Sequence, residues 1–165
     1  MLTLENILEE WQEDCQIDEN NLDISSIEIA KLHAKYLEML SITKLKLKKT
    51  ELNQKILLKE KWLYYNGKLT EDELIEKGWE FDPFRGMKIM KGDMNRYYDS
   101  DIDIQQSEEK VIYFKTTVET LTEIVDTLRW KHQTISNIIK WKMFQAGGYN
   151  FITKEKRSYV TCWLR

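Results

Sequence analysis

Apolar side chains recur every three or four positions along most of this chain, a spacing that predicts α-helices. The first helix is predicted from about Thr3 to Asp14, on the strength of four apolar positions: Leu4, Ile7, Leu8 and Trp11. A polar connector follows at residues 18–21. A single proline and six glycines leave few helix breakers, which favours an all-α fold.

The second predicted helix is unusually long. Ser25 and Glu28 have the spacing of a capping box, and no glycine or proline intervenes before Asn66-Gly67, which forms a typical helix stop. A helix of this length spans roughly 60 Å, so we expect it to pack against another helix or another subunit. Its predicted apolar stripe consists of Ile24, Ile27, Ala34, Leu37, Leu45, Leu52, Ile56 and Leu63.

A short helix and a long loop are predicted next. Thr70 and Glu73 have the spacing of a second capping box, and Gly78 is placed to end the helix that they begin. Residues 79–106 contain the single proline, two glycines and scattered aromatic side chains. This composition predicts a loop, and a loop of this length is usually functional or poorly ordered.

The last long helix carries the most regular pattern in the sequence. Ser107 is predicted to cap it and Gly147-Gly148 to end it. Its apolar positions alternate spacings of three and four, as in a coiled-coil seam: Val111, Phe114, Val118, Leu121, Val125, Leu128, His132, Ile135 and Ile139. Such a seam can join two helices of one chain or helices of two subunits.

We favour a role for this seam in homo-oligomerisation, with six of its residues as the predicted contacts: Val118, Leu121, Val125, Leu128, Ile135 and Ile139. His132 is expected to be a polar residue that sets the register rather than a ligand. The organisation predicted is one helical domain over residues 1–147, with the loop at 79–106, followed by a basic, extended tail at 148–165.

Charge is distributed in blocks along the chain. The formal net charge is −3. Residues 1–40 carry −8, residues 41–68 carry +6, residues 69–128 carry −8 and residues 129–165 carry +7. Such a chain can present a basic surface although it is acidic in total. Alternatively, the acidic and basic blocks neutralise one another between packed helices.

Several classes of protein are disfavoured by the residues. No run of about 18 apolar residues is present, so no membrane-spanning helix is expected. Two cysteines, Cys15 and Cys162, are too few for a disulfide framework and favour a reducing, cytoplasmic setting. The histidines have no partners at metal-ligand spacing. Residues 99–103 begin like a calcium loop, but Ile104 and Lys110 stand where that loop needs glycine and glutamate, so these acids are expected to form a solvated turn. We expect neither an enzyme nor a cofactor or metal.

The segment from Lys59 to Lys68 is the most informative candidate site. It combines lysines, which neutralise phosphates, with aromatic rings, on which bases stack. The candidate DNA-binding residues here and just upstream are Lys48, Lys55, Lys59, Lys61, Tyr64, Tyr65 and Lys68. On a helix, Lys59 and Lys61 point about 200° apart, so one flat surface cannot use both equally. The competing interpretation is that the aromatic residues belong to the core and the lysines keep this helix end soluble.

An ordered set of short stretches resembles the UvsY-like recombination mediators of T-even-type bacteriophages and their cyanophage relatives. The matching stretches are Leu4-Glu5-Asn6 through Trp11, Ile17-Asp18, the pattern Lys59-x-Lys61-x-x-Tyr64-Tyr65-x-Gly67, and Phe144-Gln145-Ala146-Gly147. The resemblance covers residues 2–147 in the same order, and no single stretch is specific by itself. The tail beyond Gly148 and the long aromatic loop depart from the family's pattern.

The resemblance implies a non-enzymatic protein that binds single-stranded DNA and helps a RecA-like phage recombinase replace the phage single-strand-binding protein in the cytoplasm of the infected host cell. It implies that Lys59 and Lys61 contact the DNA, and that the protein forms a ring-like homo-oligomer of about six or seven subunits supported by the C-terminal helix. Two rival interpretations remain at this point: a helical adaptor that binds another phage or host protein, and a module for duplex DNA or RNA.

Overall fold

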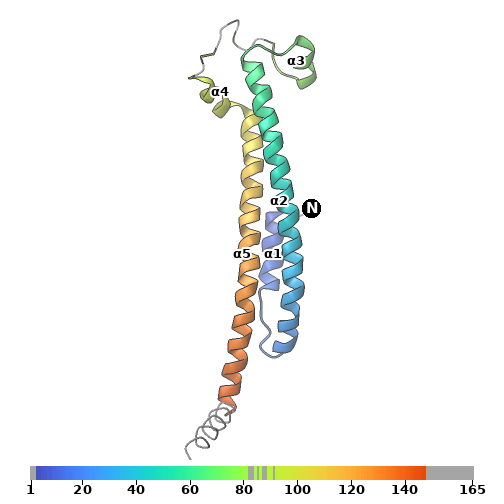
Figure 1. The fold of residues 1–165 in the computed structure, drawn as a ribbon, viewed down its shortest axis with the longest axis vertical. Helices are drawn as coiled ribbons and strands as arrows, with labels where there is room; N and C mark the ends of the chain where they lie inside the picture. The colour runs from blue at the N-terminus through green and yellow to red at the C-terminus, as the bar shows by residue number, and fades with distance from the viewer. Residues whose placement is uncertain (1–2, 82–83, 85, 87–88, 91, 148–165) are drawn as a thin grey trace, which may run out of the picture. The chain divides into compact units, whose positions relative to one another are not determined.

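The computed structural model describes residues 3–81, 84, 86, 89–90 and 92–147, and every regular element among them is a helix (Figure 1). The all-α prediction is confirmed. The elements are α1 (Leu4–Asp14), α2 (Leu22–Tyr65), α3 (Glu71–Lys77), α4 (Met94–Ser100) and α5 (Ile102–Gln145). Among these residues, no helix is long and apolar enough to cross a membrane. The predicted basic tail, residues 148–165, lies outside the described residues.

The ends of the short helices follow the sequence signals. Thr3 precedes α1, and its hydroxyl accepts a hydrogen bond from the backbone N–H of Asn6 at 3.3 Å. Thr70 and Glu73 form both halves of a capping box at the start of α3. Gly78 ends α3 with a φ of 66°, a left-handed conformation that favours glycine. These predictions are confirmed.

The two long helices begin earlier than their predicted caps, and both of those predictions are wrong. Ser25 lies inside α2, where its N–H already donates to the carbonyl of Asn21 at 3.0 Å. Ser107 lies inside α5, which begins at Ile102. The segment predicted as a loop over residues 79–106 therefore contains α4 and the first turn of α5. In both helices a polar residue further upstream precedes the first turn, Asn21 before α2 and Asp101 before α5.

The described residues group into two compact units, and each long helix contributes to both. The first unit consists of α1, α2 up to Leu40, and α5 from Thr120 onward. The second consists of α2 from Ser41, α3, α4, and α5 up to Glu119. The single domain predicted over residues 1–147 remains a prediction.

A network around Asp14 joins the helices of the first unit. The Asp14 carboxylate accepts hydrogen bonds from the Lys35 ammonium at 2.8 Å and from the Tyr36 hydroxyl at 2.9 Å, while Lys131 donates to its backbone carbonyl at 2.7 Å. Burial by itself would raise the pKa of the Asp14 carboxyl, but its bonds to Lys35 and Tyr36 outweigh that effect and lower it. The Trp11 and Tyr36 rings meet edge to face with centroids 5.5 Å apart. Three elements are thereby connected through the last turn of α1.

The seam predicted on α5 is largely covered within a single chain. Leu121, Val125, Leu128 and Ile135 are buried, whereas Val118 is half-buried and Ile139 is 41 % exposed. His132 is exposed. The heptad pattern is thus satisfied by this chain's own packing. As contacts between subunits these residues stay a prediction, but four of the six have no free surface to offer a second copy in this structure.

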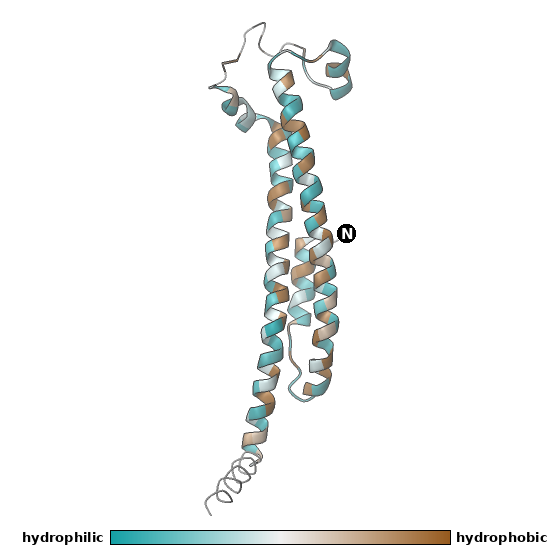
Figure 2. Ribbon diagram, in the orientation of Figure 1, coloured by the Kyte–Doolittle hydropathy of each residue, from teal (hydrophilic) through white to brown (hydrophobic). Residues whose placement is uncertain are grey.

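The apolar stripe predicted on α2 lies on the exposed side of the helix. In the second unit Leu45 is 73 % exposed, and Leu52 and Ile56 are also exposed. The buried positions of α2 are instead Ser25, Tyr36, Leu40, Thr43 and Lys61. The helix thus has apolar residues on two faces, and Figure 2 shows brown segments along both long helices. Most of the stripe predicted from the sequence is therefore not the face of α2 that packs.

Ile135 and Ile139 offer a matched test of which part of the seam is core. Ile135 is 1 % exposed and Ile139 is 41 % exposed, one turn further along α5. We expect Ile135→Ala to lower the free energy of unfolding by about 2–5 kcal/mol, because it leaves a cavity, and Ile139→Ala to lower it by less than about 1 kcal/mol. Urea denaturation at one fixed protein concentration measures both. Equal losses would show that Ile139 is as well covered in solution as Ile135.

Candidate nucleic-acid interface

The end of α2 is held in one conformation by its own hydrogen bonds. Gly67 has a φ of 61° and donates from its N–H to the carbonyl of Tyr64 at 2.9 Å, and the N–H of Lys68 donates to the carbonyl of Leu63 at 2.9 Å. The Asn66 side chain donates to the carbonyl of Trp62 at 2.7 Å. This is a Schellman-type stop, and it confirms the predicted role of Asn66-Gly67.

Lys61 lies in the interior of the second unit rather than on its surface. The residue is 5 % exposed, and its ammonium forms ion pairs with Asp101 at 2.8 Å and with Asp103 at 2.6 Å. The same nitrogen lies 4.3 Å from the centre of the Trp79 ring, a cation–π distance. Its charge is therefore neutralised inside the protein, and a phosphate could reach it only by displacing these groups.

The two carboxylate oxygens of Asp101 bind different helix ends, the start of α5 and the end of α2. One oxygen accepts hydrogen bonds from the N–H groups of Asp103 at 2.9 Å and Ile104 at 3.2 Å, and so caps α5. The other oxygen accepts from the Lys61 ammonium and from the Tyr65 hydroxyl, the latter at 2.6 Å. Burial alone would raise the pKa of the Asp101 carboxyl, but the hydrogen bonds from Lys61, Tyr65 and the backbone lower it. Asp101 is thus ionised and fully bonded.

Tyr64 and Tyr65 are half-buried members of an aromatic cluster. The Tyr64 hydroxyl donates to the carbonyl of Glu80 at 3.0 Å, and its ring lies 5.1 Å from that of Trp79. The Tyr65 ring lies within 6.0 Å of three further rings, those of Phe84, Tyr97 and Tyr98. Burial, together with the hydrogen bond to Asp101, raises the pKa of the Tyr65 phenol. Both tyrosines are thus already used within the fold.

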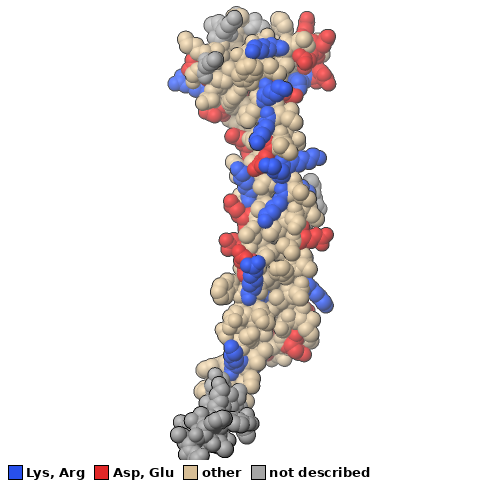
Figure 3. All heavy atoms as spheres, in the orientation of Figure 1, with Lys and Arg blue, Asp and Glu red and all other residues tan. Residues whose placement is uncertain are grey.

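The remaining lysines of the basic block are exposed. Of the predicted DNA-binding residues, these are Lys48, Lys55, Lys59 and Lys68. With Lys44, three of them follow one side of α2 at spacings of four, seven and four residues, which places them on one face of the helix. We call Lys44, Lys48, Lys55 and Lys59 the lysine row. Figure 3 shows cationic side chains on the visible face of the second unit, and acidic side chains gathered over α3.

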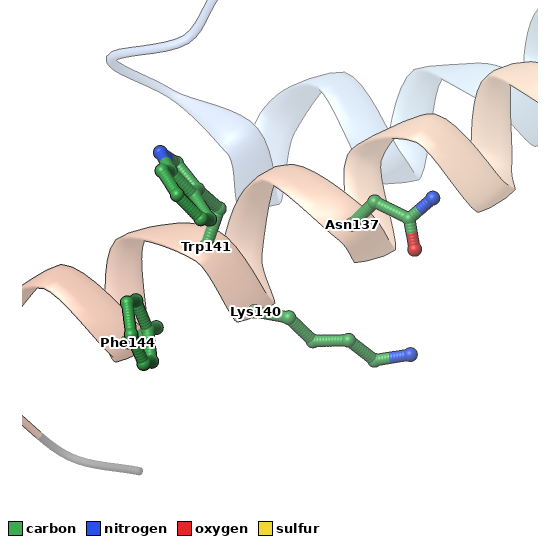
Figure 4. A pocket seen from close by; sticks show the side chains of 4 residues that line it. All are labelled: Asn137, Lys140, Trp141 and Phe144. Atoms are coloured by element: carbon green, nitrogen blue, oxygen red, sulfur yellow. The ribbon is translucent and has the colours of Figure 1, made fainter.

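A second surface feature lies near the end of α5, in the first unit. Asn137, Lys140, Trp141 and Phe144 line a shallow hollow over about two turns of the helix (Figure 4). The Trp141 and Phe144 rings stack with centroids 5.7 Å apart, and both residues are exposed. Their spacing from Ile135 places them on the opposite face from the packed seam. An apolar face of this kind is typical of a surface that contacts another molecule.

The structure corrects the interpretation of the acidic segment at residues 99–103 as a solvated turn. Asp101 is buried, and with Asp103 it neutralises Lys61. A signal for this was present in the sequence: Ile104 stands seven residues before Val111, so the seam of α5 extends back to the position that Asp101 caps. No group of acidic, histidine or cysteine residues suited to a metal ion occurs in the part of the chain that the structure describes.

The helices and their exposed lysine row define an all-helical protein with a cationic helix face. The model of the family described as "Recombination, repair and ssDNA binding protein UvsY" matches residues 10–148, and the chain belongs to this family. The recombination protein uvsY of Enterobacteria phage T4 is 23 % identical over 146 residues, which cover 88 % of this chain and 99 % of that protein.

Solved structures of the bacteriophage T4 recombination mediator protein UvsY have the same fold. One crystal form superposes with a TM-score of 0.75 at 23 % identity, covering 88 % of this chain and 99 % of the T4 chain. A second gives a TM-score of 0.72 at 19 % identity, covering 87 % and 99 %. The fold predicted from the resemblance is therefore confirmed over most of the chain.

The burial of Lys61 predicts unequal effects for the two lysines singled out by the sequence. We expect Lys61→Met to lower the free energy of unfolding by about 3–5 kcal/mol, because it leaves the buried Asp101 carboxylate without its partner. Lys59→Met, on the exposed face, should change it by less than about 0.5 kcal/mol. Chemical denaturation followed by circular dichroism measures both.

The double variant Lys61→Met/Asp101→Asn is the control for this explanation. It removes both buried charges, while asparagine keeps a side-chain oxygen for the cap of α5. It should therefore lose less stability than Lys61→Met alone. A double variant that is no more stable than the single one would contradict the assignment of the loss to an unpaired carboxylate.

Proposed function

We propose that this protein is a single-stranded-DNA-binding recombination mediator that helps a RecA-like recombinase replace the single-strand-binding protein on DNA, in phage recombination, repair and recombination-dependent replication. The observation that carries the proposal is the lysine row of α2 in a chain that belongs to the UvsY family. Ammonium groups on one helix face can follow the phosphates of an extended strand. The role is one of binding and displacement rather than catalysis.

The proposed DNA path uses the exposed lysines and leaves the buried ones to the fold. Lys48, Lys55, Lys59 and Lys68 are exposed, and Lys48 also forms an ion pair with Glu51 at 3.4 Å. Lys61 is paired with two carboxylates, so we assign it to positioning the end of α2 rather than to the DNA. Tyr64 and Tyr65 hold the aromatic cluster together and support the same helix end.

Assembly of several copies would turn a weak site into a strong one. A few lysines on one chain give salt-sensitive binding, whereas a ring of subunits repeats the row and holds one strand by avidity. We assign the assembly contact to the exposed apolar face near the end of α5, because most of the seam is buried in the single chain. Ile139, from the predicted set, is also exposed, but it lies on the seam face of α5 and not beside Trp141 and Phe144.

One observation favours a second candidate function, that of a helical adaptor for another protein. Leu45, Leu52 and Ile56 expose an apolar stripe along α2, and such a stripe fits a partner helix. The two functions differ in their response to nucleic acid. An adaptor would show no preference for single strands over duplex DNA or RNA.

Exchange of single lysines tests the proposed DNA path. We expect Lys59→Gln to weaken binding to a labelled oligothymidylate and to reduce the slope of log affinity against log salt by about 0.7 per strand contact, because one phosphate contact is lost. Lys46→Gln is the matched control, since Lys46 is exposed on a different face of α2. Fluorescence anisotropy at several salt concentrations measures both variants.

Equal effects of the two substitutions would contradict a path along the lysine row, and absence of single-strand binding by the wild-type protein would favour the adaptor. The mediator step is measured separately, as the rate of recombinase assembly on single strands coated with a single-strand-binding protein. The Lys59→Gln variant should accelerate this assembly less than the wild type does.

A charge placed on the apolar face of α5 tests the assembly contact. We expect Trp141→Glu to reduce the mass measured by light scattering, because a carboxylate would be desolvated at a contact between copies. His132→Glu introduces a carboxylate at an exposed position on a different face of the same helix and should leave the mass unchanged. Wild-type mass in the Trp141→Glu variant would exclude this face as the assembly contact.

A further inference from the structure

Trp62 continues the exposed lysine row at the end of α2. It follows Lys59 by three residues and Lys55 by seven, so the three side chains share a face of the helix. Trp62 is 42 % exposed, so part of its indole is open to solvent. Lys61, the preceding residue, points instead into the ion pairs with Asp101 and Asp103.

The backbone of Trp62 belongs to the helix stop, while its ring stays partly exposed. Its carbonyl accepts a hydrogen bond from the Asn66 side chain at 2.7 Å, and the turn at Gly67 brings the chain back over the helix end. As a result, the ammonium of Lys68 lies 4.3 Å from the centre of the Trp62 ring. The ring and the ammonium are held together by local geometry and by a cation–π contact.

The other aromatic residues at this helix end are engaged with one another. Tyr64 packs on Trp79, and Tyr65 packs on Phe84, Tyr97 and Tyr98. Among the described aromatic residues, no ring is stacked on Trp62. An exposed indole, next to an ammonium and in line with a row of lysines, combines the two groups that a single-stranded nucleotide needs: a flat face for its base and a cation for its phosphate.

We propose that Trp62 is a base-stacking residue for single-stranded DNA and that Lys68 binds the phosphate beside the stacked base. This rests on the proposed function, because it places the DNA along the lysine row. The site replaces the tyrosine pair as the aromatic platform predicted from the sequence. It makes binding depend on the presence of bases while remaining tolerant of their identity, since every base has a stacking face.

The experiment compares two oligonucleotides of equal length, an oligothymidylate and an abasic strand with the same phosphates. We expect Trp62→Leu to weaken binding to the oligothymidylate by at least about fivefold, because stacking on an aromatic ring contributes roughly 1–3 kcal/mol per base. Binding to the abasic strand and the salt slope should not change. Trp62→Phe keeps a ring and should bind close to the wild type.

Two further variants separate the roles within the site. Lys68→Gln should weaken binding to both oligonucleotides and reduce the salt slope. Trp130→Leu is the matched control, because Trp130 is 72 % exposed and belongs to the first unit, whereas the lysine row belongs to the second. It should bind both strands like the wild type.

The outcomes distinguish this inference from the function on which it rests. If the wild type binds the oligothymidylate and Trp62→Leu binds it equally well, Trp62 is not a stacking residue and the mediator proposal stands. If the wild type binds neither strand, the proposed function fails and this inference with it. A loss of oligomer mass in Trp62→Leu, measured by light scattering, would make Trp62 an assembly contact and overturn the stacking role.

Discussion

The second unit depends on the hydrogen bonds and the ion pair of the Asp101 carboxylate. One of its oxygens caps the start of α5, and the other accepts hydrogen bonds from Lys61 and Tyr65 near the end of α2. Because the group is buried, its charge would be costly without those partners. The three side chains therefore fix the end of one long helix against the start of the other. The surface features described above, the lysine row and Trp62, are carried by the helix that this contact positions.

The first unit uses a related solution. Asp14, at the end of α1, accepts hydrogen bonds from Lys35 and Tyr36, just as Asp101 accepts them from Lys61 and Tyr65. In both units, an aspartate at a helix end meets a lysine and a tyrosine from α2. A phenol beside an ion pair donates a hydrogen bond to the carboxylate without adding charge. Buried polar contacts of this kind specify which turns of the long helices lie together.

The sequence was a good guide to the helices and to the buried face of α5, but a poor guide to the buried face of α2. The helical pattern, the capping box at Thr70 and the stops at Gly67 and Gly78 depend on neighbouring residues, so local rules were sufficient. The buried face of α2 could not be predicted because apolar residues occur on both sides of that helix. Packing between distant segments decides such a case, and periodicity within one segment cannot.

Only part of the candidate site could be predicted, because packing between distant segments also decides which lysines stay exposed. Lys48, Lys55, Lys59 and Lys68 are where a surface pattern predicts, but Lys61 is drawn inward by carboxylates 40 and 42 positions further along the chain. Nothing within the local stretch Lys59–Lys68 distinguishes the exposed lysine from the buried one except their angular separation on the helix. The sequence predicts that Lys59 and Lys61 point in different directions, but it does not show which of them faces the interior.

The bond between the two helix ends also bears on how this chain can change in evolution. The residues between Asn66 and Ser100 leave the end of α2 and return to the start of α5, where Asp101 closes the connection. Lengthening such a closed connection adds little entropy cost, about 0.6 kcal/mol for each doubling. Insertions there would leave the helix pair intact, whereas a residue inserted between Lys61 and Tyr65 would rotate one partner away from Asp101. Variation in length among relatives is therefore expected to collect in the connection and to be absent from the last turn of α2.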